Sequence, residues 1–336
     1  MVLVTGATGI LGRVIVLELL KRGKNVRATK RPTSDLQEVE KSYRFYTENP
    51  SEWFQKIEWL DVDFEDIFSL KTALIGITEV YHCAAKVSFH PKDRRAMYHT
   101  NIAGTRNLLF AIENSEVKKL CFVSSTAVLD GVNEQGEVTE DSNYNPKVDH
   151  SPYARSKHFS EMEVWRASAE GLNTVIINPG VIIGSGNWEA SSGEMFSALA
   201  KYPYAMSGSS AYVDVRDVAK IAVNLMEKEV LNERFIVISG TERLLAVSNF
   251  VREKLGKPKA KLLPDFVLKI GYFLNIILGW LFPKLRMLNK VNLETVTSHH
   301  LISNQKIKQA LDYEFIPVFE SLDFHLKNYI SDHPSL

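Results

Sequence analysis

A glycine-rich turn near the amino terminus constrains the fold of this chain more than any other feature of its sequence. Residues 1–5 form an apolar run typical of a buried strand, and Gly6, Gly9 and Gly12 follow at three-residue spacing. Apolar residues then recur with helical periodicity, and a second strand-like run covers residues 25–29. Strand, glycine turn, helix and strand within about 30 residues are the context of a dinucleotide-binding βαβ unit.

Each glycine of this turn has a physical reason. Glycine adopts backbone angles that are costly for other residues, and a bare backbone lets a pyrophosphate approach the N–H groups at the start of the helix. The alternative is a simple tight turn without a ligand. We predict that the turn binds a dinucleotide through Gly6, Thr8, Gly9, Ile10, Leu11 and Gly12.

Strands and helices continue to alternate along the chain. Apolar runs predict further strands near residues 57–60, 79–84, 118–124, 173–178 and 234–238. Helical periodicity predicts helices near 97–114 and 153–169. This alternation predicts an α/β fold, a doubly wound Rossmann-type sheet that is mostly parallel and covered by helices on both faces.

The alternation is lost in segments 180–212 and 240–316, which carry several Gly and Pro residues. We expect these segments to be irregular and to form a smaller substrate-binding cap over the carboxyl edge of the sheet. The predicted cofactor domain covers residues 1–179 and about 212–240. The predicted cap covers about 180–211 and 241–320, with a C-terminal tail or helix at 321–336.

Composition excludes several classes of protein. The 336 residues include 40 Lys and Arg against 40 Asp and Glu, and this zero net charge argues against a nucleic-acid partner. Cys83 and Cys121 are too few for a disulfide framework, and no Cys/His spacing fits a metal site. We expect two core thiols, no metal and a reducing compartment. The first residues carry no secretory signal pattern, so we expect a cytoplasmic protein.

The end of the second strand predicts which dinucleotide binds. An NAD-selective site places an acidic residue about 20 residues after the glycine turn, where it bonds the ribose 2′-hydroxyl. This chain has Lys30 and Arg31 there, and no acidic residue before Asp35. A guanidinium fits a 2′-phosphate better than a diol, so Arg31, helped by Lys30, predicts NADP(H) rather than NAD(H). The alternative is two solvated surface cations.

The segment Tyr153-Ala-Arg-Ser-Lys157 is the second strong motif. Ser151 and Pro152 are typical of a helix cap and first helical position, which places Tyr153 and Lys157 one turn apart on one face. A nearby ammonium is expected to lower the pKa of the phenol and to make it a usable acid or base. The alternative is an ordinary surface pair.

The strand that ends in Ser-Ser-Thr126 adds hydroxyl groups to this region. Open α/β sheets bind ligands at the carboxyl ends of their strands. A hydroxyl placed there can donate a hydrogen bond to a substrate carbonyl oxygen. Ser125 and Thr126 are both candidates.

Together, the glycine turn preceded by Thr5 and the Tyr153/Lys157 motif resemble the extended short-chain dehydrogenases/reductases, the NAD-dependent epimerase/dehydratase superfamily. The resemblance covers most of the chain. In that superfamily the catalytic Ser or Thr lies five residues before a glycine, which selects Thr126, with Ser125 as its neighbouring candidate. The resemblance also implies that Asn101 supports the active-site lysine through water.

The resemblance implies further cofactor contacts. Two residues after the third strand look like the pair that contacts adenine, and the segments after the fourth strand and around residue 180 look like turns beside the nicotinamide. Besides Tyr153 and Lys157, the implied contacts are Asp63, Phe64, Ala84, Ala85, Lys86, Pro179, Gly180 and Val181.

Segments 178–184 and 212–219 look most like the dihydroflavonol reductase and cinnamoyl-CoA reductase branch, with 3β-hydroxysteroid dehydrogenases as cousins. This implies an NADP(H)-dependent oxidoreductase that reduces a ketone or aldehyde of a fairly apolar small molecule, or catalyses the reverse. A nucleotide-sugar epimerase or dehydratase with the same Tyr, Lys and Thr is an alternative, although Asp130 stands where such enzymes usually carry Tyr. A non-catalytic NADP(H)-sensing protein is a second alternative.

An apolar stretch at residues 266–282 is marginal for a bilayer span because it has 17 residues and contains Lys269 and Asn275. Residues 252–290 hold nine Lys or Arg against Glu253 and Asp265, a local charge of +7. The stretch is consistent with a cap helix over the substrate, with a homodimer contact, or with peripheral binding to an anionic membrane. The sequence leaves these three alternatives open.

Overall fold

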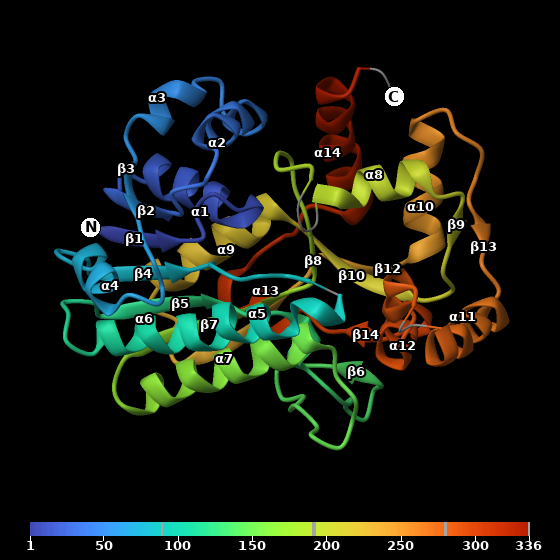
Figure 1. The fold of residues 1–336 in the computed structure, drawn as a ribbon. Helices are drawn as coiled ribbons and strands as arrows, with labels where there is room; N and C mark the ends of the chain where they lie inside the picture. Colours follow the sequence, from blue (N-terminus) through green and yellow to red (C-terminus); the bar gives the residue numbers. More distant parts are fainter. Residues whose placement is uncertain (89, 190–192, 279–280, 335–336) are drawn as a thin grey trace.

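The computed structural model describes residues 1–88, 90–189, 193–278 and 281–334 (Figure 1). Its centre is a seven-stranded sheet in the order β11-β7-β5-β4-β1-β2-β3, with every neighbouring pair parallel. The strands are β1 (Val2–Thr5), β2 (Val26–Lys30), β3 (Glu58–Asp61), β4 (Glu79–His82), β5 (Lys119–Val123), β7 (Asn173–Pro179) and β11 (Glu233–Val237). The predicted parallel, doubly wound sheet is confirmed.

Helices cover both faces of this sheet, and each face has its own apolar core. On one face, α1 (Ile10–Lys21), α9 (Val215–Glu227) and α13 (Gln305–Leu311) contribute Ile15, Leu225 and Ile307 to the larger core. On the other face, α4 (Ile67–Ala73), α6 (Gly104–Ile112) and α7 (Pro152–Ala169) bury Leu70, Leu108 and Val164. The short helices α2 (Leu36–Ser42) and α3 (Pro50–Phe54) connect β2 to β3, and α5 (Arg94–Tyr98) precedes α6.

The expectation of irregular structure in segments 180–212 and 240–316 is wrong. A second sheet forms there from β8 (Val181–Ile183), β10 (Ser209–Asp214) and β12 (Gly240–Arg243), and a third core packs on it with α8 (Glu194–Lys201), α10 (Leu244–Lys254) and the C-terminal helix α14 (Val318–Asp332). The strands are short and pair with partners far along the chain, so no local pattern predicts them.

The periphery is built from smaller elements. Two-stranded pairs join β9 (Tyr204–Ala205) to β13 (Lys261–Leu262) and β14 (Leu301–Ile302) to β6 (Glu137–Val138). Helices α11 (Asp265–Leu278) and α12 (Lys290–Thr297) follow β13 and lie far from the central sheet in Figure 1. Within the described ranges, no helix is both long and apolar enough to cross a membrane.

Candidate active site

The glycine turn between β1 and α1 has no room for side chains. Gly6 has a φ of +65°, and a Cβ there would lie 2.6 Å from the backbone nitrogen of Ala84. A Cβ on Gly12 would lie 2.2 Å from the carbonyl oxygen of Gly6. Gly9 precedes the first residue of α1 and offers no side-chain cap, so the positive end of the helix remains available to an anion. The turn therefore fits a pyrophosphate.

A buried arginine, which the sequence analysis missed, supports this turn. The side chain of Arg13 is only 1% exposed and forms an ion pair of 2.7 Å with Glu38. Its guanidinium also donates hydrogen bonds to the carbonyl oxygens of Thr8 and Gly9. Glu38 in turn accepts a hydrogen bond from the backbone N–H of Asn187. The place of Arg13 among apolar residues in the first half of α1 was the available signal.

The end of β4 lies beside the turn. The hydroxyl of Thr5 is 2.7 Å from Nδ1 of His82, and Nε2 of His82 is 3.0 Å from the hydroxyl of Thr105. Burial, together with the charge of Lys157, lowers the pKa of His82 to about 3. His82 is therefore neutral at physiological pH and joins β1 and β4 to α6. Ala84 donates its backbone N–H to Thr5, which fixes the start of the loop that contains Ala85 and Lys86.

The two cations at the end of β2 have different surroundings. Lys30 forms an ion pair of 2.6 Å with Asp61 at the end of the neighbouring strand β3. Arg31, the next residue, is exposed. Lys30 thus has a protein partner already, and Arg31 is the cation that the strand presents to solvent.

The residues after β3 also differ from each other. Asp63 is exposed, and its carboxylate accepts a hydrogen bond from the backbone N–H of Glu65. The ring of Phe64 stacks on His82 with centroids 5.8 Å apart, and it lies against Gly104. Phe64 therefore packs into the protein, whereas Asp63 lies at the surface.

Helix α7 carries the Tyr/Lys motif. The Ser151 side chain accepts a hydrogen bond from the backbone N–H of Ala154, and Pro152 is the first helical residue, as predicted. Tyr153 is half-buried, whereas Lys157 is only 2% exposed. The Lys157 ammonium donates to the carbonyl oxygen of Val123 at 2.6 Å, which places it at the end of β5.

The pKa of Tyr153 lies above its ordinary value in this structure, although we expected the Lys157 ammonium to lower it. Burial raises the pKa of Tyr153, and a hydrogen bond with the Ser125 hydroxyl opposes that rise only in part. Burial also lowers the pKa of Lys157 to about 8, against the opposing charge of Glu161. Tyr153 is therefore a protonated phenol at neutral pH and is suited to donate a proton.

Of the two candidate hydroxyls after β5, Ser125 is the one that interacts with the Tyr153 phenol. Its oxygen also accepts a hydrogen bond from the backbone N–H of Ala127. Thr126 instead begins the short 3-10 turn Thr126–Val128. The interaction with the phenol favours Ser125 over Thr126 as the hydroxyl beside Tyr153.

Asn101 lies in a π-helical segment, His99–Ala103, between α5 and α6. Its side-chain oxygen accepts from the backbone N–H of Lys86 at 2.7 Å, and its amide donates to the Lys86 carbonyl and to the Ser156 hydroxyl. Asn101 thus joins the loop after β4 directly to α7, next to Lys157. Such π-helical segments are frequent at functional sites.

Glu161 is a second residue that the sequence analysis missed. It is 3% exposed and lies one turn after Lys157 on α7. Its carboxylate accepts hydrogen bonds from the Ser124 hydroxyl at 2.6 Å and from the Asn178 amide at 3.2 Å. The i, i+4 spacing from Lys157 was the available signal.

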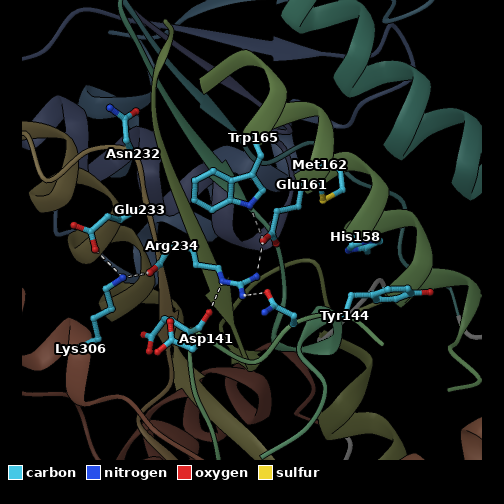
Figure 2. A pocket seen from close by; sticks show the side chains of 12 residues that line it. Asp141, Tyr144, His158, Glu161, Met162, Trp165, Asn232, Glu233, Arg234 and Lys306 are labelled. Atoms are coloured by element: carbon cyan, nitrogen blue, oxygen red, sulfur yellow. Dashed lines mark hydrogen bonds and ion pairs between the residues drawn. The ribbon is translucent and has the colours of Figure 1, made fainter. Parts of the chain in front are cut away.

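The other oxygen of Glu161 points toward a pocket of about 430 Å³ between α7 and β11 (Figure 2). There it forms an ion pair of 3.2 Å with Arg234. Lys306 and Glu233, which also line this pocket, form an ion pair of 2.7 Å with each other. The Glu161–Arg234 ion pair joins α7 to β11, and the lining of the pocket also contains the acidic residues Glu140 and Asp141.

The end of β7 and the residues that follow it close the site. Asn178 donates to the carbonyl oxygen of Ser125, and its own side-chain oxygen is buried without a hydrogen-bond partner among the described residues. A Cβ on Gly180 would lie 2.5 Å from the Ala211 carbonyl oxygen. Pro179 is buried, and Val181 begins β8. Three glycines without side-chain room and a buried unpaired acceptor fit a polar ligand such as a dinucleotide along this edge.

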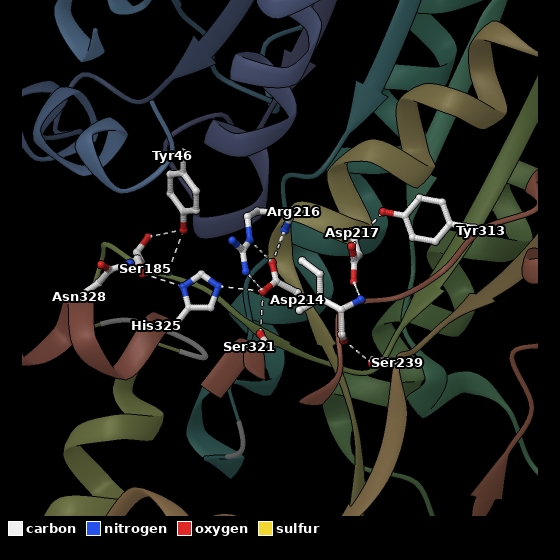
Figure 3. Close-up of polar contacts among 11 residues, drawn as sticks. Tyr46, Ser185, Asp214, Arg216, Asp217, Ser239, Tyr313, Ser321, His325 and Asn328 are labelled. Carbon is white, nitrogen blue, oxygen red and sulfur yellow. Dashed lines mark hydrogen bonds and ion pairs between the residues drawn. The ribbon is translucent and has the colours of Figure 1, made fainter. Parts of the chain in front are cut away.

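A buried network attaches the C-terminal helix to the cofactor side of the molecule (Figure 3). Ser185 lies 2.6 Å from Nδ1 of His325 in α14, and Nε2 of His325 lies 3.2 Å from Asp214. All three residues are fully buried, and burial lowers the pKa of His325. Ser, His and Asp are the residue types of a hydrolase triad, but here Ser185 and Asp214 meet the opposite ring nitrogens and the hydroxyl is buried away from any substrate. We conclude that the network is structural.

The two thiols are buried or half-buried. Burial raises the pKa of Cys83 to about 12 and that of Cys121 well above its usual value, so neither thiol is reactive. His299 and His300 are exposed. Across the described part of the chain, no group of His, Cys, Asp and Glu side chains could hold a metal ion.

Comparisons with known proteins identify the family of this chain. The model of the NAD dependent epimerase/dehydratase family matches residues 2–238. Sterol demethylase protein B of Methylococcus capsulatus is 29% identical over 270 residues, 77% of this chain and 76% of that protein. Cinnamoyl-CoA reductase 1 of Oryza sativa is 29% identical over 289 residues, 78% of this chain and 81% of that protein.

The fold has a close counterpart among solved structures. The structure of gox2253 superposes with a TM-score of 0.83 at 25% identity and covers 99% of this chain and 98% of the other. The resemblance to the extended short-chain dehydrogenases/reductases, and to their cinnamoyl-CoA reductase branch, is confirmed. The chain belongs to the NAD dependent epimerase/dehydratase family.

Proposed function

We propose that this protein is an NADP(H)-dependent oxidoreductase that reduces a ketone or aldehyde of a fairly apolar small molecule, or catalyses the reverse reaction. The observation that carries the proposal is the convergence of the Tyr153 phenol, the Ser125 hydroxyl and the Lys157 ammonium at the carboxyl edge of the sheet. These are the groups that a carbonyl oxygen needs when it becomes an alcohol.

The residues along the edge would hold the dinucleotide. Its pyrophosphate would lie on the glycine turn, and Arg31 would select a 2′-phosphate because it is the exposed cation at the end of β2. When bound, the nicotinamide supplies the hydride donor or acceptor. This assignment of NADP(H) rests on Arg31 alone, because Lys30 is paired with Asp61.

The protein's own groups then act on the substrate oxygen. The phenol of Tyr153, whose raised pKa keeps its proton in place, donates that proton to the oxygen as negative charge develops there. The hydroxyl of Ser125 donates a hydrogen bond to the same oxygen and orients it. Lys157 adds positive charge and is fixed by the Val123 carbonyl.

Relatives support a reductase over the alternatives. The Oryza sativa relative is named a reductase of cinnamoyl-CoA, a ligand with an apolar aromatic portion. Since both Tyr153 and Lys157 are present and positioned on α7, a purely sensing protein is disfavoured. A nucleotide-sugar epimerase would use the same residues, so the test must separate net reduction from internal redox cycling.

The test is a screen for oxidation of NADPH across aldehydes, ketones, flavonoid-like compounds and steroids. We expect substrate-dependent loss of NADPH absorbance. A dinucleotide retained through purification, with no net oxidation but epimerised sugar nucleotide, would contradict the proposal and favour the epimerase.

The cofactor assignment needs a separate measurement. We expect fluorescence titration to give tighter binding of NADPH than of NADH, and Arg31→Ser to weaken NADPH binding by about tenfold or more while leaving NADH nearly unchanged. Lys30→Ser is the matched control, with a smaller expected effect. Tighter NADH binding by the wild-type protein would reject the assignment.

A further inference from the structure

Helix α11 turns an apolar face toward solvent, unlike an ordinary surface helix. Its inward side carries Leu268, which is buried, and Asn275, whose amide donates to the carbonyl oxygen of Leu288. Gly271 also packs against Leu288 on this side. The outward side is apolar, whereas a surface helix normally turns its polar face outward.

The outward side forms a continuous stripe at helical spacing, Phe266, Ile270, Phe273 and Ile277, which we call the α11 stripe. These side chains are 62%, 53%, 61% and 49% exposed. Large apolar side chains on both sides of the stripe, including Leu274 and Ile276, are exposed as well. Contiguous exposed apolar patches of large side chains mark interaction surfaces.

The surroundings of the stripe carry positive charge. Lys259, Lys261 and Lys269 are exposed and form no ion pair within the described residues. Asp265, the one acidic residue of α11, accepts a hydrogen bond from the Ser207 hydroxyl. These three lysines are thus available to a negatively charged partner, which an apolar protein interface would not require.

Two tyrosines at and just before β9 are exposed as well. Tyr204 pairs with Lys261 in the β9–β13 ladder, and Tyr202 and Tyr204 are both more than half exposed. An aromatic ring with a polar end and a lysine with a long apolar stem are the side chains that settle at the boundary between lipid and water. The β9–β13 ladder, which precedes α11 in the chain, therefore carries side chains suited to that boundary.

We propose that the α11 stripe docks on an anionic lipid membrane, with the helix lying in the plane of the headgroups and Lys259, Lys261 and Lys269 facing the phosphates. α11 has 14 residues, fewer than the roughly 20 that a spanning helix needs, so the helix rests on the bilayer and does not cross it. This inference goes beyond the proposed function and does not depend on it.

The chain that follows α11 contacts the segment before the catalytic helix. Lys290 in α12, the helix that follows α11, lies 3.6 Å from Asp149, just before the start of α7.

The test is sedimentation of the full-length protein with vesicles of phosphatidylcholine containing phosphatidylserine, and with vesicles of phosphatidylcholine alone. We expect binding to the anionic vesicles that weakens with added salt and is much weaker on the neutral ones. The double variant Phe273→Ser/Ile277→Ser should reduce the bound-to-free ratio by about tenfold or more. Lys261→Glu/Lys269→Glu should reduce it by about fivefold or more for each lysine.

Phe68→Ser is the matched control, because Phe68 is 80% exposed on α4, far from the stripe, and its removal should leave vesicle binding unchanged. The proposal is overturned if the wild type stays in the supernatant with anionic vesicles, or if the stripe variant binds as well as the wild type. Gel filtration adds a third outcome: a wild-type dimer that the stripe variant dissociates, without vesicle binding, would show that a second copy covers the stripe. None of these measurements requires turnover, so a failure of the proposed reaction leaves them valid.

Discussion

The carboxyl edge of the central sheet and helix α11 depart from the usual distribution of side chains in opposite directions. The edge buries charged groups: Arg13, Lys157 and Glu161 are each 5% exposed or less, and every one has a polar partner. Helix α11 instead exposes Phe266 and Phe273 by about three fifths. Burying a charge costs several kcal/mol unless it is compensated, and exposing a large apolar side chain forgoes about 1.5–3 kcal/mol.

The difference teaches where to look for function. At the edge, partners within the protein compensate the buried charges, so the structure holds the groups in one geometry. On α11, nothing in the described structure compensates the exposed apolar surface. The first arrangement is typical of a preorganised reaction site, and the second of a surface that awaits a partner.

The largest expected effect comes from the edge. Tyr153→Phe removes the proton donor but keeps an aromatic ring at this position of α7. We therefore expect kcat/KM to fall about 10²- to 10⁴-fold. NADPH binding should stay within about twofold, since the phenolic proton contributes little to ground-state binding. The measurements are steady-state rates with the best substrate of the screen and fluorescence titration. Undiminished turnover would remove Tyr153 from the mechanism.

A pair of smaller variants sharpens the geometry of the edge. Because Ser125 interacts with Tyr153, we expect Ser125→Ala to lower kcat by about 10- to 100-fold and Thr126→Ala to lower it much less. The two changes remove one hydroxyl each from neighbouring positions, so each is the control for the other. The reverse ranking would restore Thr126 as the catalytic hydroxyl.

Glu161→Gln tests whether the buried charges at the edge act together. The carboxylate of Glu161 raises the pKa of Lys157, which burial lowers to about 8, so its removal should lower that pKa further. Activity that needs the ammonium falls as pH rises through this pKa, and the alkaline limb of kcat/KM should therefore shift to lower pH in the variant. The measurement is a pH–rate profile of both proteins. An alkaline limb that does not shift would show that Glu161 does not act on the pKa of Lys157.

The smallest expected effect comes from α11. Phe273→Ser/Ile277→Ser removes side chains that are already half exposed, so we expect the free energy of unfolding to change by no more than about 0.5 kcal/mol per site. Leu108→Ala, which truncates a buried side chain of α6, should lower the free energy of unfolding by about 2–5 kcal/mol. Urea denaturation measures both. A large loss from the α11 change would mean that the stripe supports the fold, and the contrast between the two regions would disappear.

Much of the fold and the site follows from local patterns in the sequence. The glycine turn, the Ser151–Pro152 helix start and the Tyr153/Lys157 spacing depend on residues within a few positions of each other. The central strands are also local, because strands buried on both faces are continuous apolar runs. The second sheet was missed because its three short strands have their partners far away along the chain.

The sequence by itself determined the class of fold, the glycine turn and the residue types that gather at its edge. The tertiary structure alone decided which hydroxyl meets Tyr153, in which direction the pKa of that phenol moves, and which partners hold Arg13 and Glu161. It also decided that the apolar side of α11 faces outward. The physical reason is that burial and long-range contacts, such as Ser185 with His325 140 residues apart, are set by packing and leave no trace in local spacing.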